Sequence, residues 1–481
     1  MTTEYDVIVI GAGAVGENAA DRTAQGGLRT IIVEAELVGG ECSYWACMPS
    51  KALLRSSALL RSAQHVGGTR EAVTGPLDVR AVLRRRDRIT HHWDDGSQAE
   101  WLRSAGIDLA RGHGVITAPR EVTVTAEDGT VTVLTARHAL VVATGSASLL
   151  PDIPGLRESR PWTSRDATSV EQVPASLAIL GGGVVAVEMA TAYAGFGVEV
   201  HLVSRSGLLK NDEPFAGEAV EKSLRALGVK VHLDVSPFSV ERGDDGSIRL
   251  QLDDDSTVVA EELLVATGRI PHTGGLGLET YGLSGGEWLT VDDSMRVLGS
   301  DGEPAGDGGL YGVGDVNHRA LLTHQGKYQA RAAGDAIAAR ARGTDVSLAP
   351  WGAFVATADH QAVPQVTFTD PEVASVGLTA AAAEKAGYRI RVVDYAIENV
   401  AGATIASDDY AGTARMVVDE DRRVVIGATF VGADVGELLH SATVAIVGEV
   451  PIDRLWHAVP SYPTISEVWL RLLEGYGRPA A

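Results

Sequence analysis

The chain opens with the pattern of a buried strand, a glycine-rich turn and a helix. Residues 6–10 form an almost unbroken apolar run, as expected of a parallel strand that is covered on both faces. The sequence Gly-Ala-Gly-Ala-Val-Gly follows at residues 11–16, residues 17–25 have a helical pattern, and residues 30–33 form a second apolar run that ends at Glu34. This order predicts a βαβ unit of about thirty residues with an acidic residue closing its second strand.

A second copy of this pattern lies farther along the chain. Residues 177–180 form the apolar strand, residues 181–186 the turn Gly-Gly-Gly-Val-Val-Ala, residues 187–196 the helix and residues 198–203 the next strand. Each copy is followed by short alternating strands, at 122–124 with 131–133 and at 247–252 with 257–259. Each ends alike, in Val141-Val-Ala-Thr-Gly145 and Leu264-Val-Ala-Thr-Gly268. The repeat predicts an α/β protein with two Rossmann-like dinucleotide-binding domains.

The pattern changes from about residue 350. Strands are expected at 363–367, 389–395, 414–418 and 424–431, and helices at 379–386, 436–448 and 466–473. No glycine-rich phosphate turn occurs here, so this α+β region is expected to form an interface. The predicted domains are residues 1–150 together with 271–349, residues 151–270, and residues 350–481.

Charge and hydropathy restrict the partners. The net charge is −22 over 481 residues, and an acidic surface repels nucleic acid and anionic lipid. The dense basic run Arg84-Arg85-Arg86 is interpreted as a solvated helix face. No apolar run has the length of a membrane span, and the first strand starts too near the N-terminus for a signal peptide, so a cytoplasmic location is expected.

The two cysteines, Cys42 and Cys47, follow directly on the second strand. Two cysteines are too few for the disulfide framework of a secreted protein, and no close-set ligands accompany them to form a zinc site. Pro49 suits the first turn of a helix, which places Cys47 at a helix N-terminus with Lys51 one turn further on. Both features stabilise a thiolate. The pair is either a redox-active disulfide or two unrelated thiols, and its position favours the disulfide.

Each glycine-rich turn has the composition of a pyrophosphate site. Gly11 allows the tight turn, Gly13 lets the backbone approach the phosphates, and Gly16 lets the helix pack closely on the strand. The phosphates would lie at the positive end of the helix dipole, and Glu34 would accept hydrogen bonds from the ribose hydroxyls. The corresponding turn positions of the second copy are Gly181, Gly183 and Ala186.

Ser204 stands where the second copy should have its acidic residue, and Arg205 follows it. A guanidinium without a carboxylate suits a 2′-phosphate, which favours NADPH over NADH. The alternative is that Arg205 is only a surface charge, because the strand boundary could be misplaced by one residue.

With these motifs the sequence resembles the pyridine nucleotide-disulfide oxidoreductases, which include dihydrolipoamide dehydrogenase, glutathione reductase and mercuric reductase. The resemblance covers nearly the whole chain and rests on Gly-Gly-Glu-Cys42-x4-Cys47-x-Pro-Ser-Lys51, Ala143-Thr-Gly145, the second glycine turn with Glu188, and Leu310-Tyr-Gly-Val-Gly-Asp315. It implies FAD in the first domain, NADPH or NADH in the second, and electron transfer through a Cys42–Cys47 disulfide to a small-molecule acceptor. It also implies a homodimer formed by the C-terminal domain, in which the partner chain completes each active site.

The resemblance further implies individual roles. Cys47 would be the charge-transfer thiol beside the flavin and Cys42 the interchange thiol, while Lys51 would lie near flavin N5 and pair with Glu188. Additional FAD contacts are implied for Gly40, Lys51, Gly114, Thr144, Gly145, Asp315, Leu322 and Thr323, and a nicotinamide-nucleotide contact for Gly268. No metal site is expected. Tyr44 and Trp45, between the cysteines, would either line the acceptor pocket or shield the bridge.

One catalytic position departs from the family. Many members have His-Pro-Thr followed three residues later by Glu, whereas this chain has Tyr462-Pro-Thr and then Glu467. A tyrosine titrates near 10 and a histidine near 6.5, so tyrosine is a poorer base at pH 7 by about 4 kcal/mol. Dihydrolipoamide oxidation, which needs that base, is therefore not expected, unless His457 serves instead. The expected acceptor is a small disulfide, and the alternatives are a quinone, a metal ion, or a redox sensor of low turnover.

Overall fold

The computed structural model describes residues 2–478, which divide into two compact units. The first unit contains the residues up to Pro49 together with Asp87–Leu149 and Arg269–Asp359. The second contains Ser50–Arg86, Leu150–Gly268 and the described residues from His360 onward. Each unit has its own hydrophobic core. The three-domain division expected from the sequence stays a prediction, and in the structure Ser50–Arg86 groups with the second unit.

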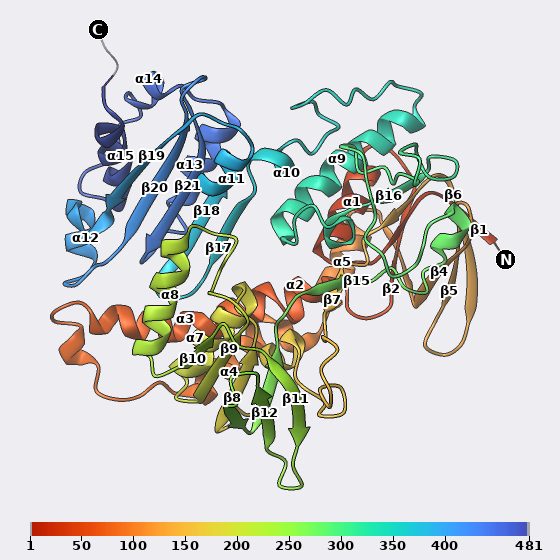
Figure 1. The fold of residues 1–481 in the computed structure, drawn as a ribbon. Coiled ribbons are helices and arrows are strands. Elements are labelled where there is room, and N and C mark those ends of the chain that lie inside the picture. The colour runs from red at the N-terminus through yellow and green to blue at the C-terminus, as the bar shows by residue number, and fades with distance from the viewer. Residues whose placement is uncertain (1, 479–481) are drawn as a thin grey trace. The chain divides into compact units, whose positions relative to one another are not determined.

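The first unit is built on a sheet whose strands run in the order β3-β2-β1-β6-β5-β4, with β16 paired to β6 (Figure 1). Apolar residues of β1, β2 and β6 fill its centre because these strands are buried on both faces. Its strands are β1 (Thr2–Ile10), β2 (Thr30–Glu34), β3 (Asp108–Arg111), β4 (His113–Ala118), β5 (Glu121–Thr125), β6 (Val131–Val142) and β16 (Leu310–Gly312). A separate antiparallel pair consists of β7 (Ser146–Ser148) and β15 (Arg269–Pro271). Its helices include α1 (Ala14–Gln25), α2 (Gly40–Tyr44), α5 (Gly96–Ser104) and α9 (Thr323–Ala341), and α1 packs against α9.

The second unit begins with a parallel sheet in the order β10-β9-β8-β14. A three-stranded antiparallel sheet, β11-β12-β13, lies between β10 and β14 in the chain. The elements of this part are β8 (Ser176–Leu180), α7 (Val184–Gly195), β9 (Glu199–Ser204), α8 (Pro214–Ala226), β10 (Lys230–Leu233), β11 (Pro237–Arg242), β12 (Ile248–Leu252), β13 (Thr257–Ala260), β14 (Glu262–Val265) and α6 (Ser164–Ser169). The strands and helices of both βαβ units begin and end within four residues of where the hydrophobic pattern predicts them.

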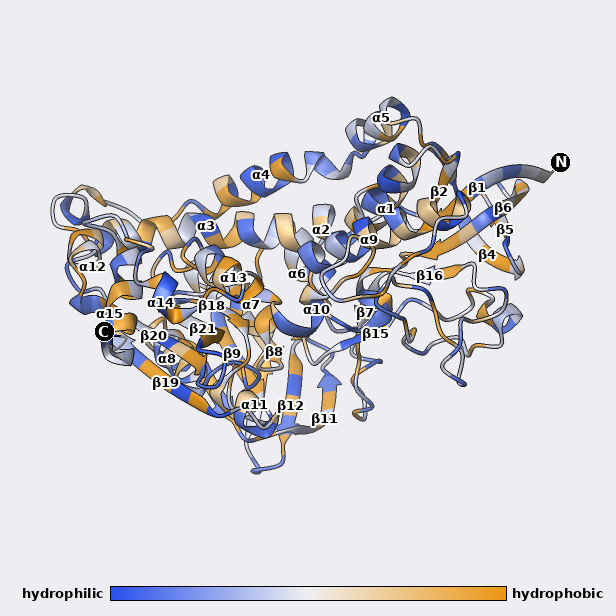
Figure 2. Cartoon of the chain, turned by 90° about the horizontal axis from the view of Figure 1, so that it is seen from above, coloured by the Kyte–Doolittle hydropathy of each residue, from blue (hydrophilic) through white to orange (hydrophobic). Residues whose placement is uncertain are grey.

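The C-terminal part of the second unit is an antiparallel sheet in the order β17-β18-β21-β20-β19. The apolar colouring of β18, β20 and β21 in Figure 2 agrees with their burial in this part of the unit. The strands are β17 (Pro364–Thr367), β18 (Glu372–Gly377), β19 (Ile390–Ala396), β20 (Thr413–Asp419) and β21 (Val424–Gly432), and the helices are α11 (Ala380–Lys385), α12 (Ala401–Ala406), α13 (Leu439–Val447), α14 (Ile452–Leu455) and α15 (Val468–Tyr476). β18 was not expected, because its short run contains Ala374 and Ser375 and follows directly on a proline.

Three boundaries between the units fall within helices. The chain passes from the first unit to the second within α3 (Cys47–Gln64), from the second to the first within α4 (Val79–Ile89), and from the first to the second again within α10 (Ala358–Gln361). Of the helices between residues 2 and 478, none has an apolar stretch of the length that a bilayer requires.

The expectation that the arginine run is a solvated helix face is wrong for Arg86. Its side chain lies on the buried face of α4 with Val82 and Leu83, and only 2% of the residue is exposed. The guanidinium donates hydrogen bonds of 2.7 Å to the Thr168 carbonyl and 2.8 Å to the Val170 carbonyl. These carbonyls lie at the C-terminal end of α6, where the helix dipole favours a cation. Arg86 is buried because the helical periodicity of α4 places it on the same face as Val82 and Leu83. Counting charges along the sequence does not reveal this periodicity.

Candidate redox and dinucleotide sites

The glycines of the first turn divide into two kinds. Gly11 has a φ of +99°, and a Cβ added there would lie 2.5 Å from the Ala143 carbonyl oxygen. A Cβ on Gly16 would lie 1.9 Å from the Gly11 oxygen. These two glycines are therefore required by the packing of the protein itself. A Cβ on Gly13 would meet no atom closer than 3.9 Å, so that glycine instead keeps the N-terminus of α1 open. An open backbone at a helix N-terminus fits a bound pyrophosphate.

Glu34 is held in place at the end of β2. Its Oε2 atom accepts a 2.6 Å hydrogen bond from the backbone N–H of Ala12, and its Oε1 atom accepts one of 2.7 Å from Glu36. Burial raises the pKa of the carboxyl, and the two backbone hydrogen bonds act against that increase. Each oxygen keeps a further lone pair that could accept a hydroxyl donor. The carboxylate is thus oriented beside the turn, as a ribose-binding group must be.

The second turn repeats the division found in the first. Gly181 has a φ of +136°, and its Cβ would lie 2.3 Å from the Ala266 oxygen, whereas a Cβ on Gly183 would meet no atom within 4 Å. Ala186 is fully buried in α7. The residues present therefore fit a dinucleotide at each turn.

Strand register shows which residue of the second copy corresponds to Glu34. Ile10 pairs with Val33 in the first unit, and Leu180 pairs with Val203 in the second. The next residue in each case is the last of its strand, Glu34 in β2 and Ser204 in β9. The strand boundary is therefore not displaced. Arg205 lies exposed in the turn that follows.

The cysteines lie on two successive short helical segments. Cys42 belongs to α2, Cys47 is the first residue of α3, and the backbone N–H groups of Trp45 and Ala46 both bond to the Glu41 carbonyl where α2 ends. The structure shows no bond between the two cysteines. A hydrogen bond to Cys47 and then burial raise the pKa of Cys42.

Thr323 joins the second cysteine to α9. Its Oγ1 atom lies 3.3 Å from the Sγ atom of Cys47, at hydrogen-bond distance for sulfur. Thr323 is the first residue of α9 and Leu322 immediately precedes that helix. The N-termini of α3 and α9 thus carry Cys47 and its hydroxyl partner, and both helix ends favour negative charge.

Within the second unit, Lys51 and Glu188 form an ion pair. The Nζ atom of Lys51 donates to Oε2 of Glu188 at 2.7 Å, and the carboxylate side chain is only 4% exposed. The Oε1 atom accepts a 3.0 Å hydrogen bond from the backbone N–H of Phe368. The Phe368 ring centroid lies 4.9 Å from the ammonium. Phe368 was not expected at the site, because it acts through its backbone and belongs to no chemical motif.

Asp315 lies in a short polar network of the first unit. The hydroxyl of Ser146 donates to its Oδ2 atom at 2.5 Å, and Arg269 donates to the Ser146 hydroxyl at 2.6 Å. The Arg269 Nε atom is 3.7 Å from the carboxylate. Ser146 and Arg269 were not expected, although each directly follows the terminal glycine of one repeat copy. Their position after Gly145 and Gly268 is the signal that could have identified them.

The other glycines expected at the cofactors are arranged as follows. Gly145 and Gly268 have positive φ values of +73° and +155°, and a Cβ added to Gly145 would meet no described atom within 4 Å. Gly40 adopts a φ of +58° directly against Gly13, and Gly114 packs on Val33 within β4. Thr144 has its hydroxyl bonded to the His272 carbonyl at 2.6 Å.

Tyr462 and Glu467 both lie in the second unit but are differently placed. Tyr462 is 76% exposed, whereas Glu467 is buried and its Oε1 atom accepts a 2.5 Å hydrogen bond from Arg471. The Oε2 atom of Glu467 has no hydrogen-bond partner among residues 2–478. The structure therefore does not join Tyr462 to Glu467 by a hydrogen bond within the described chain. His457 is exposed.

Tyr44 packs within the first unit and does not line an open pocket. It is 1% exposed, and its hydroxyl contacts the Val38 carbonyl at 3.2 Å and the Gln98 side chain at 3.0 Å. Trp45 lies edge-on to it, with ring centroids 5.7 Å apart. Tyr44 therefore packs among protein atoms, and the two roles expected for Tyr44 and Trp45, lining the acceptor pocket or shielding the bridge, stay predictions.

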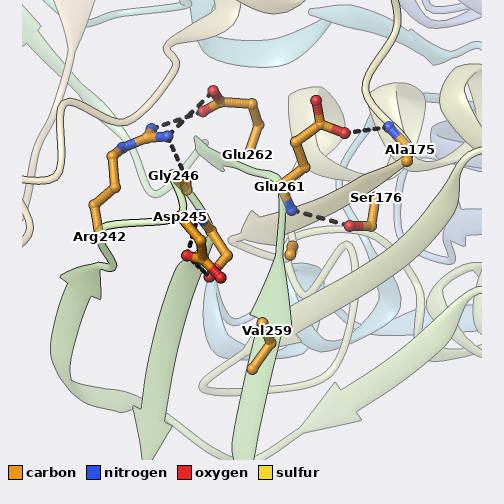
Figure 3. Close-up of a pocket in the computed structure, with 10 residues that line it drawn as sticks. Ala175, Ser176, Arg242, Asp245, Gly246, Val259, Glu261 and Glu262 are labelled. Carbon is orange, nitrogen blue, oxygen red and sulfur yellow. Dashed lines mark hydrogen bonds and ion pairs between the residues drawn. The ribbon is translucent and has the colours of Figure 1, made fainter.

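A separate pocket of about 490 Å³ lies in the second unit (Figure 3). Its charged groups are satisfied by one another and by backbone, as in the Arg242–Glu262 pair and the bond from the Ala175 N–H to Glu261. No predicted site residue lines it. In the described part of the chain no three His, Cys, Asp or Glu side chains gather as a metal site.

Two open glycine turns and a dithiol beside the first define a class of dithiol oxidoreductases that use two dinucleotides. Comparison with known proteins agrees. The family model described as pyridine nucleotide-disulphide oxidoreductase matches residues 5–336, and that of the family's dimerisation domain matches residues 363–472. The chain belongs to the pyridine nucleotide-disulphide oxidoreductase family. It is therefore an oxidoreductase whose cofactors are FAD and NADPH or NADH.

Relatives of two activities resemble the chain about equally. A dihydrolipoyl dehydrogenase from Chlorobaculum tepidum is 31% identical over 477 residues, which cover 97% of this chain and 96% of the relative. A mercuric reductase from Staphylococcus aureus is 30% identical over 468 residues, which cover 96% and 81%. Among solved structures, the HOCl-induced flavoprotein disulfide reductase RclA from Escherichia coli, as its Cu(II) complex, has a TM-score of 0.82 at 21% identity and covers 98% of this chain and 99% of that one. This structural likeness shows the fold alone.

Proposed function

We propose that the enzyme uses NADPH to reduce a small disulfide through Cys42 and Cys47. The observation that carries this proposal is the arrangement of the two thiols: Cys47 begins α3 and contacts the Thr323 hydroxyl, while Cys42 has the raised pKa. Bound FAD supplies the two-electron carrier between the nicotinamide and the cysteines. Overall, NADPH, one proton and the acceptor disulfide give NADP⁺ and two thiols.

The two cysteines have different parts in this reaction. Cys42 gives up its proton and attacks the acceptor disulfide as a thiolate, which forms a mixed disulfide and releases one acceptor thiolate that takes up a proton. The Cys47 thiolate then attacks the Cys42 sulfur, which forms the Cys42–Cys47 bond and releases the second acceptor thiolate, and this thiolate takes up the one proton of the overall equation. The acceptor gains two electrons and the cysteine pair loses two. The position of Cys47 at the N-terminus of α3, beside the Thr323 hydroxyl, supports this division, because both features stabilise a resident thiolate.

The preference for NADPH is supported by Ser204 and Arg205. Ser204 occupies the register position of Glu34, so no carboxylate is present there to repel a 2′-phosphate. Arg205 is exposed beside it, and a guanidinium can bind a phosphate through two hydrogen bonds.

Tyr462 is proposed to act from the partner subunit of a homodimer. The matching dimerisation-domain model and the exposure of Tyr462 (76%) and nearby Val459 (84%) support this assignment. Such apolar exposure is typical of a surface that a second chain covers. Because tyrosine is a poor base, dihydrolipoamide oxidation is not proposed, despite the dihydrolipoyl dehydrogenase among the relatives.

The decisive experiment compares acceptors with each nicotinamide. Steady-state kcat/KM is measured for small disulfides, quinones and Hg²⁺, with NADPH and with NADH, for the unaltered enzyme and for Cys42→Ser. We expect disulfides to be the best acceptors and Cys42→Ser to abolish their reduction. Undiminished disulfide reduction by Cys42→Ser would refute the proposed role of the pair. If Cys42→Ser loses disulfide reduction but still reduces quinones, quinone reduction is a side reaction of the flavin alone.

A further inference from the structure

Glu17 has a half-buried side chain on α1, which contacts α2, the helix that carries Cys42, and it has no part in the proposed reaction. It lies one turn after Gly13 in α1, and its backbone N–H bonds to the Gly13 carbonyl at 3.0 Å. Gly13 faces Gly40, the first residue of the helix that carries Cys42: an added Cβ on Gly13 would lie 3.9 Å from the Gly40 Cα. Because residues four apart share a helix face, Glu17 is on the side of α1 that faces α2.

One of the two oxygens of the Glu17 carboxyl is not satisfied by hydrogen bonding. Its Oε1 atom is buried and has no hydrogen-bond partner in the described chain. Burial raises the pKa of this carboxyl to about 7. An unpaired buried carboxyl is costly, and such groups are rare where they have no function.

Lys327 links Glu17 electrostatically to the cysteines. It lies one turn after Thr323, whose hydroxyl contacts Cys47, and it directly follows Gly326. A Cβ on Gly326 would lie 2.5 Å from the Cγ2 atom of Val15, so α1 and α9 touch at this level. The positive charge of Lys327 lowers the pKa of both Glu17 and Cys42.

The other titratable groups around Glu17 have smaller or opposite effects. Glu34, at the end of β2, raises the pKa of Glu17. Tyr44, on α2, has a pKa of about 12, raised first by burial and then by nearby carboxylates that include Glu17. Lys327 is therefore the cation through which a change at Glu17 reaches the dithiol.

We propose that Glu17, acting through Lys327, sets the pH range over which the Cys42–Cys47 dithiol ionises. When Glu17 is protonated, the charge of Lys327 is unopposed and stabilises a thiolate. When Glu17 ionises, it offsets that charge, and the thiols hold their protons more strongly. Glu17 is thus a positioning residue whose titration flattens the pH dependence of the dithiol near neutrality. This inference rests on the proposed redox role of the two cysteines.

The test measures thiol ionisation directly in the flavin-containing enzyme. After reduction, the long-wavelength thiolate–flavin absorbance and the rate of Cys42 alkylation by iodoacetamide are followed against pH, with the alkylated peptide identified by mass spectrometry. At pH 7.5 we expect Glu17→Gln to be alkylated about threefold faster and Lys327→Met about threefold slower, since half a pKa unit is about threefold. Glu17→Asp should restore the unaltered profile.

The double variant distinguishes coupling from a local effect. If Glu17 acts through Lys327, then Glu17→Gln changes little when Lys327 is already methionine. An equal shift in both backgrounds would overturn the proposal, as would superimposable profiles of Glu17→Gln and the unaltered enzyme. Asp21→Asn, one turn further along α1, is the matched control and should leave the profile unchanged. If Glu17→Gln does not retain FAD, the pH profile of Lys327→Met, which should shift in the opposite direction, tests the proposal.

These measurements need no acceptor, so their outcome is separate from that of the acceptor screen. If no disulfide is reduced but the Glu17–Lys327 coupling is observed, only the proposed function is overturned. Normal disulfide reduction without coupling would overturn this inference only.

Discussion

The ammonium of Lys51 donates a 2.7 Å hydrogen bond to Glu188, whose carboxylate is buried and also accepts the backbone N–H of Phe368. Three elements of the second unit, α3, α7 and the segment after β17, thus converge on one carboxylate. Removing a single member of such a cluster leaves a buried partner unsatisfied.

Glu188→Gln should therefore destabilise the protein by about 1–3 kcal/mol, because the ammonium loses its counter-charge while the Phe368 N–H can still bond to the amide oxygen. Denaturant unfolding measures this change. Phe368→Ala is the control: it keeps the backbone bond and removes only the ring, so it should cost about 1 kcal/mol for the cation–π contact, plus any lost packing. Equal stability of Glu188→Gln and the unaltered protein would contradict the structural pairing.

The position of Ser204 predicts that coenzyme preference can be reversed. Ser204→Glu combined with Arg205→Ala places a carboxylate at the register position of Glu34 and removes the guanidinium. We expect kcat/KM for NADPH to fall at least about tenfold and that for NADH to rise, since a charge contact to phosphate contributes about 1.5–3 kcal/mol. Arg205→Ala alone should weaken NADPH without improving NADH. An unchanged NADPH:NADH ratio in the double variant would refute the assignment.

Burial of Glu17 predicts a pH dependence of stability with a definite sign. Its pKa is raised from 4.5 to about 7, so the folded state favours the protonated form. The associated stability is complete below pH 4.5 and is lost as the pH rises to about 7, by at most about 3 kcal/mol. Glu17→Gln removes this loss, so it should be as stable as the unaltered protein in acid and more stable at and above pH 7. Denaturant unfolding of both proteins across this pH range, at matched ionic strength, measures the effect. A difference in the free energy of unfolding that grew as the pH fell would contradict the prediction.

Arg86 should matter for stability far more than its neighbours in the run. Arg86→Met leaves the carbonyls of Thr168 and Val170 without their donors in a buried setting, which should cost about 2–4 kcal/mol. Arg84 is exposed and its nearest acidic group is 3.9 Å away, so Arg84→Met is a matched control with an effect below about 0.5 kcal/mol. Thermal unfolding of the two variants tests the difference. Similar Tm values for the two variants would show that Arg86 is solvated, as the arginine run alone indicates.

Local sequence pattern predicted the βαβ units because their strands are continuous apolar runs and their glycines are dictated by backbone geometry. Gly11, for instance, can be replaced by no larger residue without meeting the Ala143 carbonyl. The same pattern could not predict Phe368, whose backbone contributes through a partner far away in the chain. The buried state of Glu17 was equally hidden, because it depends on how α1 packs against α2 and α9. Chemistry carried by spacing was thus predictable, whereas chemistry created by tertiary packing was not.

The tyrosine at position 462 provides a test of how the acid–base group selects the reaction. Tyr462→His would replace a phenol by an imidazole, and the ordinary pKa of an imidazole, near 6.5, is well below that of a phenol, near 10. A matched base contributes typically 10²–10⁴-fold to proton transfer, so we expect NAD⁺- or NADP⁺-dependent dihydrolipoamide oxidation to rise by at least about tenfold. Disulfide reduction should change less, since tyrosine can still donate a proton. Tyr462→Phe is the control, and it should lose that donor without gaining dithiol oxidation. If the histidine variant oxidises dihydrolipoamide no faster than the unaltered enzyme does, Tyr462 is not the group that limits this direction, and the exposed His457 becomes the next residue to replace.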